Sequence, residues 1–121
     1  MSYRVTLARL KKLDRPELTE RAYADDGMFC ALGAVLPILR TLPGADMEAS
    51  IRVLCAAYPE IEEAVTTELQ MTVEEAYALQ QYNDNVLRSP TTPYNVREPG
   101  KARYRRVVMW LETKLAERSK K

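Results

Sequence analysis

Histidine is absent from this sequence of 121 residues, and with it the commonest general base, proton shuttle and metal ligand. Long apolar runs are absent too, since none approaches the roughly 20 residues that span a bilayer. The N-terminus lacks the apolar core of a signal peptide. The two cysteines, Cys30 and Cys55, have neither the spacing of a metal site nor the density of a disulfide scaffold. We therefore expect a cytoplasmic protein without a membrane segment, with both cysteines reduced in its core.

The size and composition of the chain suit one globular domain. Hydrophobic residues make up 46% of the sequence and charged residues 29%, which is too apolar for disorder. The net charge of +1 hides a segregation: residues 46–85 carry nine acids against one base, and residues 86–121 carry ten bases against three acids. Oppositely charged helices that pack side by side would explain this pattern, and so would a basic binding face.

Apolar residues recur at helical spacing, whereas strict alternation is scarce, so we predict an all-α fold. The prediction is a single compact domain, residues 1–121, of five or six helices with one long proline-rich loop at 83–100. The helix after Cys30 should be central, because it is apolar on nearly all sides. The expected helices cover residues 3–13, Pro16 through Ala22, Phe29 to about Leu42, Asp46 to Tyr58, 60–69, 73–82 and 101–118, and a frayed tail follows at 118–121. We expect a bend or a late start at Pro37, Asp46 as the cap of its helix, and a Thr72–Glu75 capping box before residue 73. In the helix that Asp46 caps, the inward residues should be Ile51, Leu54, Cys55 and Tyr58.

Cys30 is the first candidate for chemistry. It follows Asp26-Gly27 by a few residues and is expected in the first turn of a helix, where amides and the helix dipole lower the pKa of a thiol. The alternative is a small buried core residue, which we favour because no histidine is present to act as base. A catalytic role would require Asp84 or a water to take the proton. Gly33 costs a helix about 1 kcal/mol relative to alanine, so another backbone or a ligand should touch it.

Three consecutive polar residues, Asn83, Asp84 and Asn85, follow an apolar helix face. Helix termination explains one or two of them. The third indicates either a hydrogen-bonded clamp to the Cys30 turn or a contact with a ligand or partner. A divalent cation would have only Asp25 and Asp26 as further clustered carboxylates, and we assign no metal and no cofactor.

A basic and aromatic set, which includes Arg106, straddles the start of the last helix, and we expect Arg103 and Arg106 to face solvent. Arginine beside tyrosine near a helix N-terminus can hold phosphate or stack a base, although a solvated helix face is the usual explanation. The expected partner is a host protein or a small anionic ligand, with nucleic acid as an alternative. The candidate binding residues are Asn83, Asp84, Asn85, Tyr94, Arg97, Lys101, Arg103, Tyr104 and Arg105.

The segment Asp26-Gly27-x-x-Cys30-Ala31-Leu32-Gly33-Ala34, with the later Tyr82-Asn83-Asp84, resembles a family of small uncharacterised proteins from phages and actinobacteria. In that family a Cys-x-x-Gly-Ala helix precedes a Trp-Asn-Asp or Leu-Asn-Asp motif and a final helix. The resemblance spans about residues 18–118 and implies no activity. The function that we expect is that of a small cytosolic binding protein of phage or mobile-element type, which sequesters a ligand or blocks a host protein. The alternatives are a hydrolase or transferase using Cys30 and Asp84, and a nucleic-acid binder using the last helix.

Overall fold

A computed structural model describes residues 3–14, 16–19, 23, 29–42, 50–84 and 99–119 of the chain. The predicted all-α fold is confirmed: these ranges hold helices and a single isolated bridge, between Leu18 and Phe29, but no strand. The elements are α1 (Arg4–Lys11), α2 (Ala31–Val35), the 3₁₀-helix η1 (Pro37–Thr41), α3 (Ile51–Ala57), α4 (Pro59–Glu63), the π-helix η2 (Ala64–Glu68), α5 (Val73–Asp84) and α6 (Gly100–Ser119).

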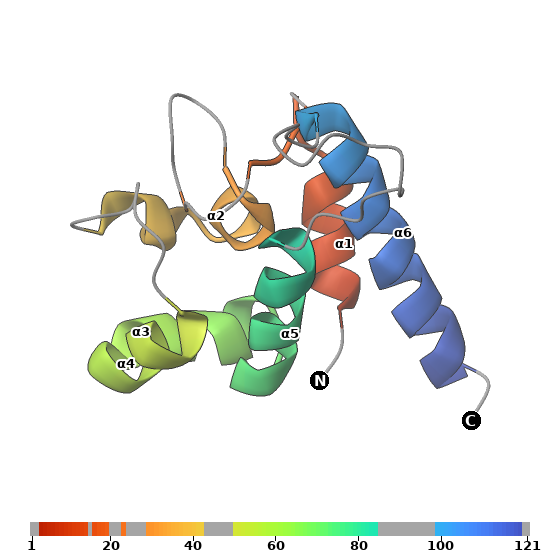
Figure 1. Cartoon of the computed structure of the whole chain (residues 1–121). Helices are drawn as coiled ribbons and strands as arrows, with labels where there is room; N and C mark the ends of the chain where they lie inside the picture. Colours follow the sequence, from red (N-terminus) through yellow and green to blue (C-terminus); the bar gives the residue numbers. More distant parts are fainter. Residues whose placement is uncertain are drawn as a thin grey trace.

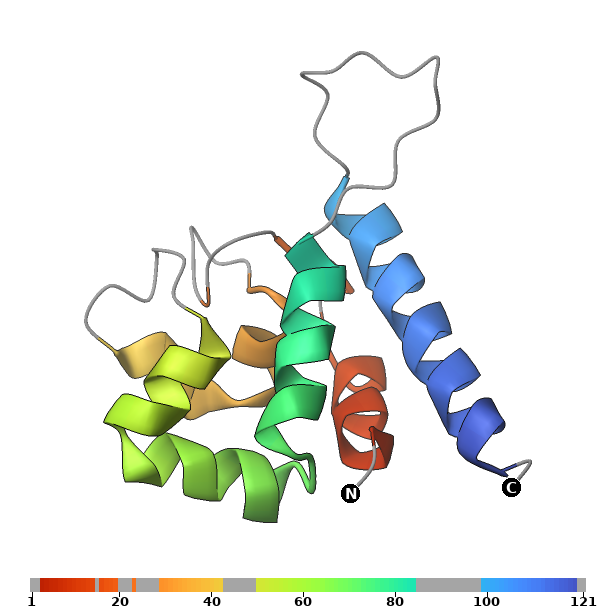
Figure 2. The ribbon, with the colours of Figure 1, turned by 60° about the horizontal axis from the view of Figure 1, so that its bottom comes forward.

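The helices lie in a simple order across the molecule. Helix α5 occupies the middle, α3 and α4 form one edge, and α1 followed by α6 forms the opposite edge (Figures 1 and 2). None of the described helices combines the length and apolar character needed to cross a membrane. Buried apolar side chains from all of these helices belong to one cluster.

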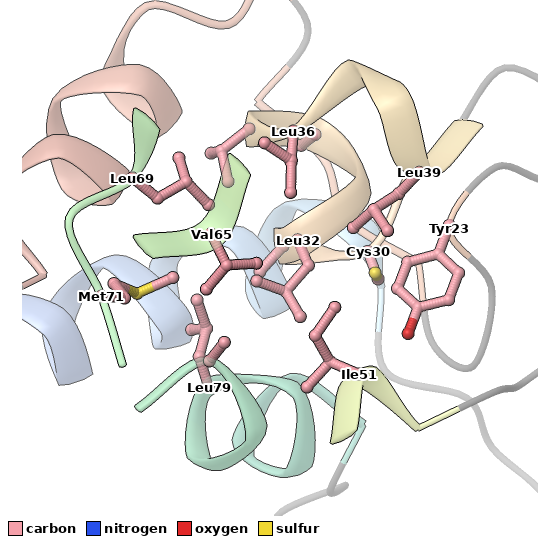
Figure 3. Close-up of a cluster of buried hydrophobic side chains, with 14 of the residues drawn as sticks. Tyr23, Cys30, Leu32, Leu36, Leu39, Ile51, Val65, Leu69, Met71 and Leu79 are labelled. Atoms are coloured by element: carbon pink, nitrogen blue, oxygen red, sulfur yellow. The ribbon is translucent and has the colours of Figure 1, made fainter. Parts of the chain in front are cut away.

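Helix α2 lies at the centre of that cluster, as its apolar sequence predicts. All five of its residues are buried. Leu32 projects toward Ile51 of α3, Val65 of η2 and Leu79 of α5 (Figure 3). The helix is short because Leu36 adopts an extended conformation (φ −129°, ψ 88°), which proline imposes on the residue before it. The predicted bend at Pro37 is thus confirmed as a break, and the helix begins at Ala31 rather than Phe29.

The predicted helix from Pro16 through Ala22 is wrong over its described part. Residues 16–19 are not helical, because their backbone groups bond to distant segments. The Leu18 amide donates to Gly100 O (3.0 Å), and the Thr19 amide donates to Phe29 O (2.9 Å). Tertiary hydrogen bonds have overridden the local helix signal here. Ala22 lies outside the described residues.

Helix α3 begins later than predicted. Ser50, not Asp46, caps it: Ser50 is extended and its Oγ accepts the Arg52 amide (3.2 Å). Asp46 itself lies outside the described residues. Ile51 and its helical neighbours Leu54 and Cys55 are buried as expected, but Tyr58 is 40% exposed. Tyr58 faces outward because it is the extended residue between α3 and the Pro59 that opens α4.

The remaining helices follow the sequence closely. The capping box is confirmed, since the Glu75 amide donates to Thr72 Oγ1 (3.0 Å) and the Thr72 amide donates to Glu75 Oε1 (2.9 Å). Helix α5 continues two residues beyond Tyr82, so Asn83 and Asp84 are helical. Helix α6 reaches Ser119, so the tail predicted at 118–121 begins later, and residues 120 and 121 lie outside the described part.

Candidate functional site

Asn83 forms the clamp that the sequence predicted. Its side chain, 1% exposed, accepts the Ala31 amide on Oδ1 (3.1 Å) and donates from Nδ2 to Thr19 O (3.0 Å) and to Asp84 Oδ1 (3.1 Å). The anchoring groups flank the predicted turn. The amide oxygen and nitrogen of Asn83 are therefore both bonded inside the fold.

Gln80, one turn before Asn83, bonds the first amide of another helix, and it was not among the predicted site residues. Its Oε1 accepts the Ile51 amide (2.8 Å) and its Nε2 donates to the Tyr23 hydroxyl (2.8 Å). The available signal was its position, since Gln80 shares the buried face of α5 with Ala76 and Asn83. The first amides of a helix have no partner within that helix. Side-chain amides of α5 therefore complete the N-termini of both α2 and α3.

Cys30 caps α2 instead of lying in its first turn. Its Sγ accepts the Gly33 amide at 3.4 Å, and the residue is 3% exposed. Burial raises the pKa of Cys30 to about 12, and the Asp84 carboxylate acts in the same direction. The sulfur lies among core side chains, beside Tyr23 and Leu39 (Figure 3). A reactive thiolate is thereby disfavoured, and the interpretation of Cys30 as a core residue is confirmed.

Gly33 is touched by another backbone, one of the two alternatives that the sequence offered. A Cβ at this position would lie 2.0 Å from Tyr23 O. No side chain fits in that space. The backbone of Tyr23 therefore lies directly against α2 at Gly33, and the glycine serves packing.

Two arginines of the predicted basic surface are used internally. Arg103 is 1% exposed and shares a stripe with the buried Val107 and Leu111, and its Nη1 donates to Asn83 O. Arg106, half-buried, donates to Tyr82 O (2.6 Å) and Asn83 O (3.2 Å). The last carbonyls of a helix lack partners within it and carry partial negative charge, so they attract cations. The prediction that Arg103 and Arg106 face solvent is therefore wrong.

The C-terminus of α2 is completed in the same way. Arg40 donates from Nε to Gly33 O (2.6 Å) and from Nη2 to Ala34 O (2.8 Å), with its guanidinium 3.9 Å above the Phe29 ring. Burial lowers the pKa of Arg40. Arg9 donates to Val35 O (2.9 Å). Arginine side chains thus occupy carbonyls at the ends of both α2 and α5.

Among the described residues, only part of the predicted binding surface is exposed. Tyr104 is half-buried and donates to Leu10 O (2.9 Å), which fastens α6 to α1. Lys101 and Arg105 are exposed one turn apart, and Met109, 67% exposed, follows one turn later. We call these three residues the basic stripe. Three predicted binding residues, Asn85, Tyr94 and Arg97, lie outside the described residues.

These features define a small all-helical protein whose buried polar side chains complete helix ends. Comparisons with protein-family models, with curated proteins and with solved structures found no match. Within the described ranges, no group of three or more Cys, Asp or Glu side chains is placed to hold a metal ion.

Proposed function

We propose that this chain is a cytosolic binding protein that engages an acidic surface of a partner protein through the basic stripe. The observation that supports the proposal is the exposure of Lys101, Arg105 and Met109 on one face of α6, while Asn83, Arg103 and Tyr104 bond to groups inside the fold. Both cysteines are free thiols, which fits a reducing compartment. A phage or mobile-element protein that blocks a host protein is the role we infer.

The environment of Cys30 argues against the alternative of a cysteine-dependent enzyme. Such an enzyme needs a thiol that is accessible and ionised near neutral pH. Cys30 is buried, its pKa is raised, and its sulfur already accepts the Gly33 amide. Asp84 makes ionisation of this thiol harder rather than easier.

The chemistry of the stripe suits a protein partner better than nucleic acid. Arginine binds carboxylates with two parallel hydrogen bonds, and methionine adapts to irregular apolar surfaces. Two cations neutralise about two phosphates, which would give a slope of log affinity against log salt near −2, whereas DNA-binding proteins commonly make 6–10 such contacts. An acidic surface with apolar side chains would use all three residues.

The test compares three forms of the full chain: wild type, K101E/R105E, and the matched control K11E/K12E at the C-terminal end of α1. Lys11 and Lys12 are also exposed. Both double variants reverse two positive charges, so they change the net charge by the same amount. The probe is a fluorescent amphipathic peptide of Glu and Leu, with duplex DNA as the second probe. We expect K101E/R105E to bind the peptide at least about tenfold more weakly, with the control unchanged.

Equal peptide binding by all three forms would show that the stripe is not the site. Tight DNA binding with a salt slope of about −6 or steeper would instead favour the nucleic-acid alternative. Capture from host cells with the same three forms would then identify the partner as a protein retained by wild type and control but lost by K101E/R105E.

A further inference from the structure

The edge opposite α6 carries the complementary surface. Val53 of α3 is 61% exposed, and Tyr58, between α3 and α4, is 40% exposed. Beside them three exposed glutamates lie on α4. We call this set the acidic edge: Val53, Tyr58, Glu60, Glu62 and Glu63.

The glutamates of the acidic edge differ from neighbouring acids. Glu68 pairs with Arg9 and Glu74 with Arg52. No ion pair to Glu60, Glu62 or Glu63 occurs among the described residues. This edge therefore combines negative charge with exposed apolar side chains, as the basic stripe combines positive charge with Met109.

The acidic edge and the basic stripe cannot meet within one molecule. Helices α5 and α1 lie between α3–α4 and α6, which form opposite edges in both views (Figures 1 and 2). The chain thus presents two surfaces of opposite charge on opposite sides, each with exposed apolar side chains available for burial.

We propose that a second copy of this chain docks its basic stripe onto the acidic edge. The inference rests on the proposed function, because it uses the same stripe and names one acidic surface that the stripe binds. The contact joins two different surfaces, so each added copy leaves one of each kind free, and copies assemble head to tail. Both surfaces are small, which makes the association weak and dependent on concentration. Assembly covers the stripe and so competes with binding of another acidic partner.

Sedimentation velocity of the purified full chain tests this. We expect the weight-average sedimentation coefficient to rise between about 10 µM and about 1 mM protein in low salt, since weak interfaces dissociate in that range. The rise should disappear in about 0.5 M NaCl, which screens charges beyond a few ångströms.

Charge-reversal variants make the test specific. K101E/R105E lacks a basic stripe and E60K/E63K lacks an acidic edge, so each should stay monomeric. An equimolar mixture should assemble, because each variant then meets surfaces of opposite charge on the other. The chain with all four substitutions should assemble again, because its charges are exchanged and still complementary. The control K11E/K12E should behave as wild type, and circular dichroism should show the same helix content throughout.

A wild-type chain that stays monomeric over the whole range in low salt would overturn the inference. So would a mixture of the two variants that stays monomeric, or a fourfold variant that remains monomeric. The peptide assay, run near 1 µM, separates this failure from that of the proposed function. E60K/E63K should keep full peptide binding, so peptide binding without self-association refutes only the inference, and self-association without peptide binding refutes only the proposed function.

Discussion

At the scale of single residues, Asn83 and Gln80 connect three helices through two amide oxygens. Each accepts the first amide of another helix, Ala31 of α2 or Ile51 of α3. These bonds add to local caps, since Cys30 Sγ accepts the Gly33 amide and Ser50 Oγ accepts the Arg52 amide. The start of each short helix is thus fixed partly from within and partly by α5, so the buried amides of α5 determine how α2 and α3 are placed.

We expect Asn83→Ala to lower the free energy of unfolding by about 1–3 kcal/mol, because it leaves the buried Ala31 amide and Thr19 carbonyl without this partner. Gln81→Ala is the matched control on the exposed side of α5 and should cost about 0.5 kcal/mol or less. Urea unfolding followed by Trp110 fluorescence measures both, since Trp110 stacks on Tyr82 at 4.9 Å. Equal costs for the two variants would mean that the Asn83 clamp contributes nothing.

We expect Gly33→Ala to destabilise the protein, although helix propensity alone predicts that it would be stabilising. Propensity alone would make alanine about 1 kcal/mol more stable in a helix interior. A Cβ at position 33 would instead lie 2.0 Å from Tyr23 O, so the backbone of α2 or of Tyr23 must move. We expect a loss of at least about 2 kcal/mol, or failure to fold. An increase in the melting temperature of Gly33→Ala would show that the backbone of Tyr23 does not lie this close to α2.

At the scale of elements, arginines replace the glycine that often ends a helix. The chain has four glycines and twelve arginines, and four of those arginines donate to terminal carbonyls of α2 or α5. A guanidinium can reach two carbonyls at once, as Arg40 does with Gly33 O and Ala34 O, whereas the lysine ammonium is a point charge.

Arg40→Lys should therefore cost about 1–2 kcal/mol of stability, although it keeps the charge. Arg105→Lys is the same substitution at an exposed position and should change stability by about 0.5 kcal/mol or less. Thermal unfolding of the two variants measured in parallel decides the matter. Equally small losses of stability at both positions would show that the two hydrogen bonds from the Arg40 guanidinium to α2 do not stabilise the fold.

Local patterns predicted the elements that local chemistry determines. The periodicity of α1 and α6, the Thr72–Glu75 capping box and the break at Pro37 are all readable within a few residues. The segment 16–19 could not be predicted, because its amides bond to Gly100 and Phe29. Arg103 could not be predicted for the same reason: a charged residue on an apolar stripe is buried only because the end of α5 receives it.

At the scale of the whole molecule, the basic residues of α6 divide into a buried group and an exposed group. Arg103 and Arg106 donate to the last carbonyls of α5, whose partial negative charge attracts cations. Lys101 and Arg105 stay exposed at one edge, and the glutamates of α4 at the other. The arginines nearest α5 thus bond to groups inside the fold. The proposed binding and self-association involve the exposed Lys101 and Arg105.

The response of the whole fold to alkali follows from two buried acids that lie together, Tyr23 and Cys30. Burial raises the pKa of Cys30 from about 9 to about 12, and it also raises the pKa of Tyr23 above its usual value. Groups whose pKa is raised by folding stabilise the protein fully below the pKa of the unfolded chain. That stability is lost as the pH rises toward the pKa of the folded protein.

We therefore expect the free energy of unfolding to fall from about pH 9 upward, by up to about 1.4 kcal/mol per pH unit for each of the two groups. Tyr23→Phe and Cys30→Ala should each reduce the slope between about pH 9.5 and 11 while lowering stability at pH 7, because the first loses the bond from Gln80 and the second the cap on Gly33. Urea unfolding of the three proteins at several pH values measures the slopes. If both variants lost stability as steeply as wild type, Tyr23 and Cys30 would not be the groups that alkali must ionise to open the core.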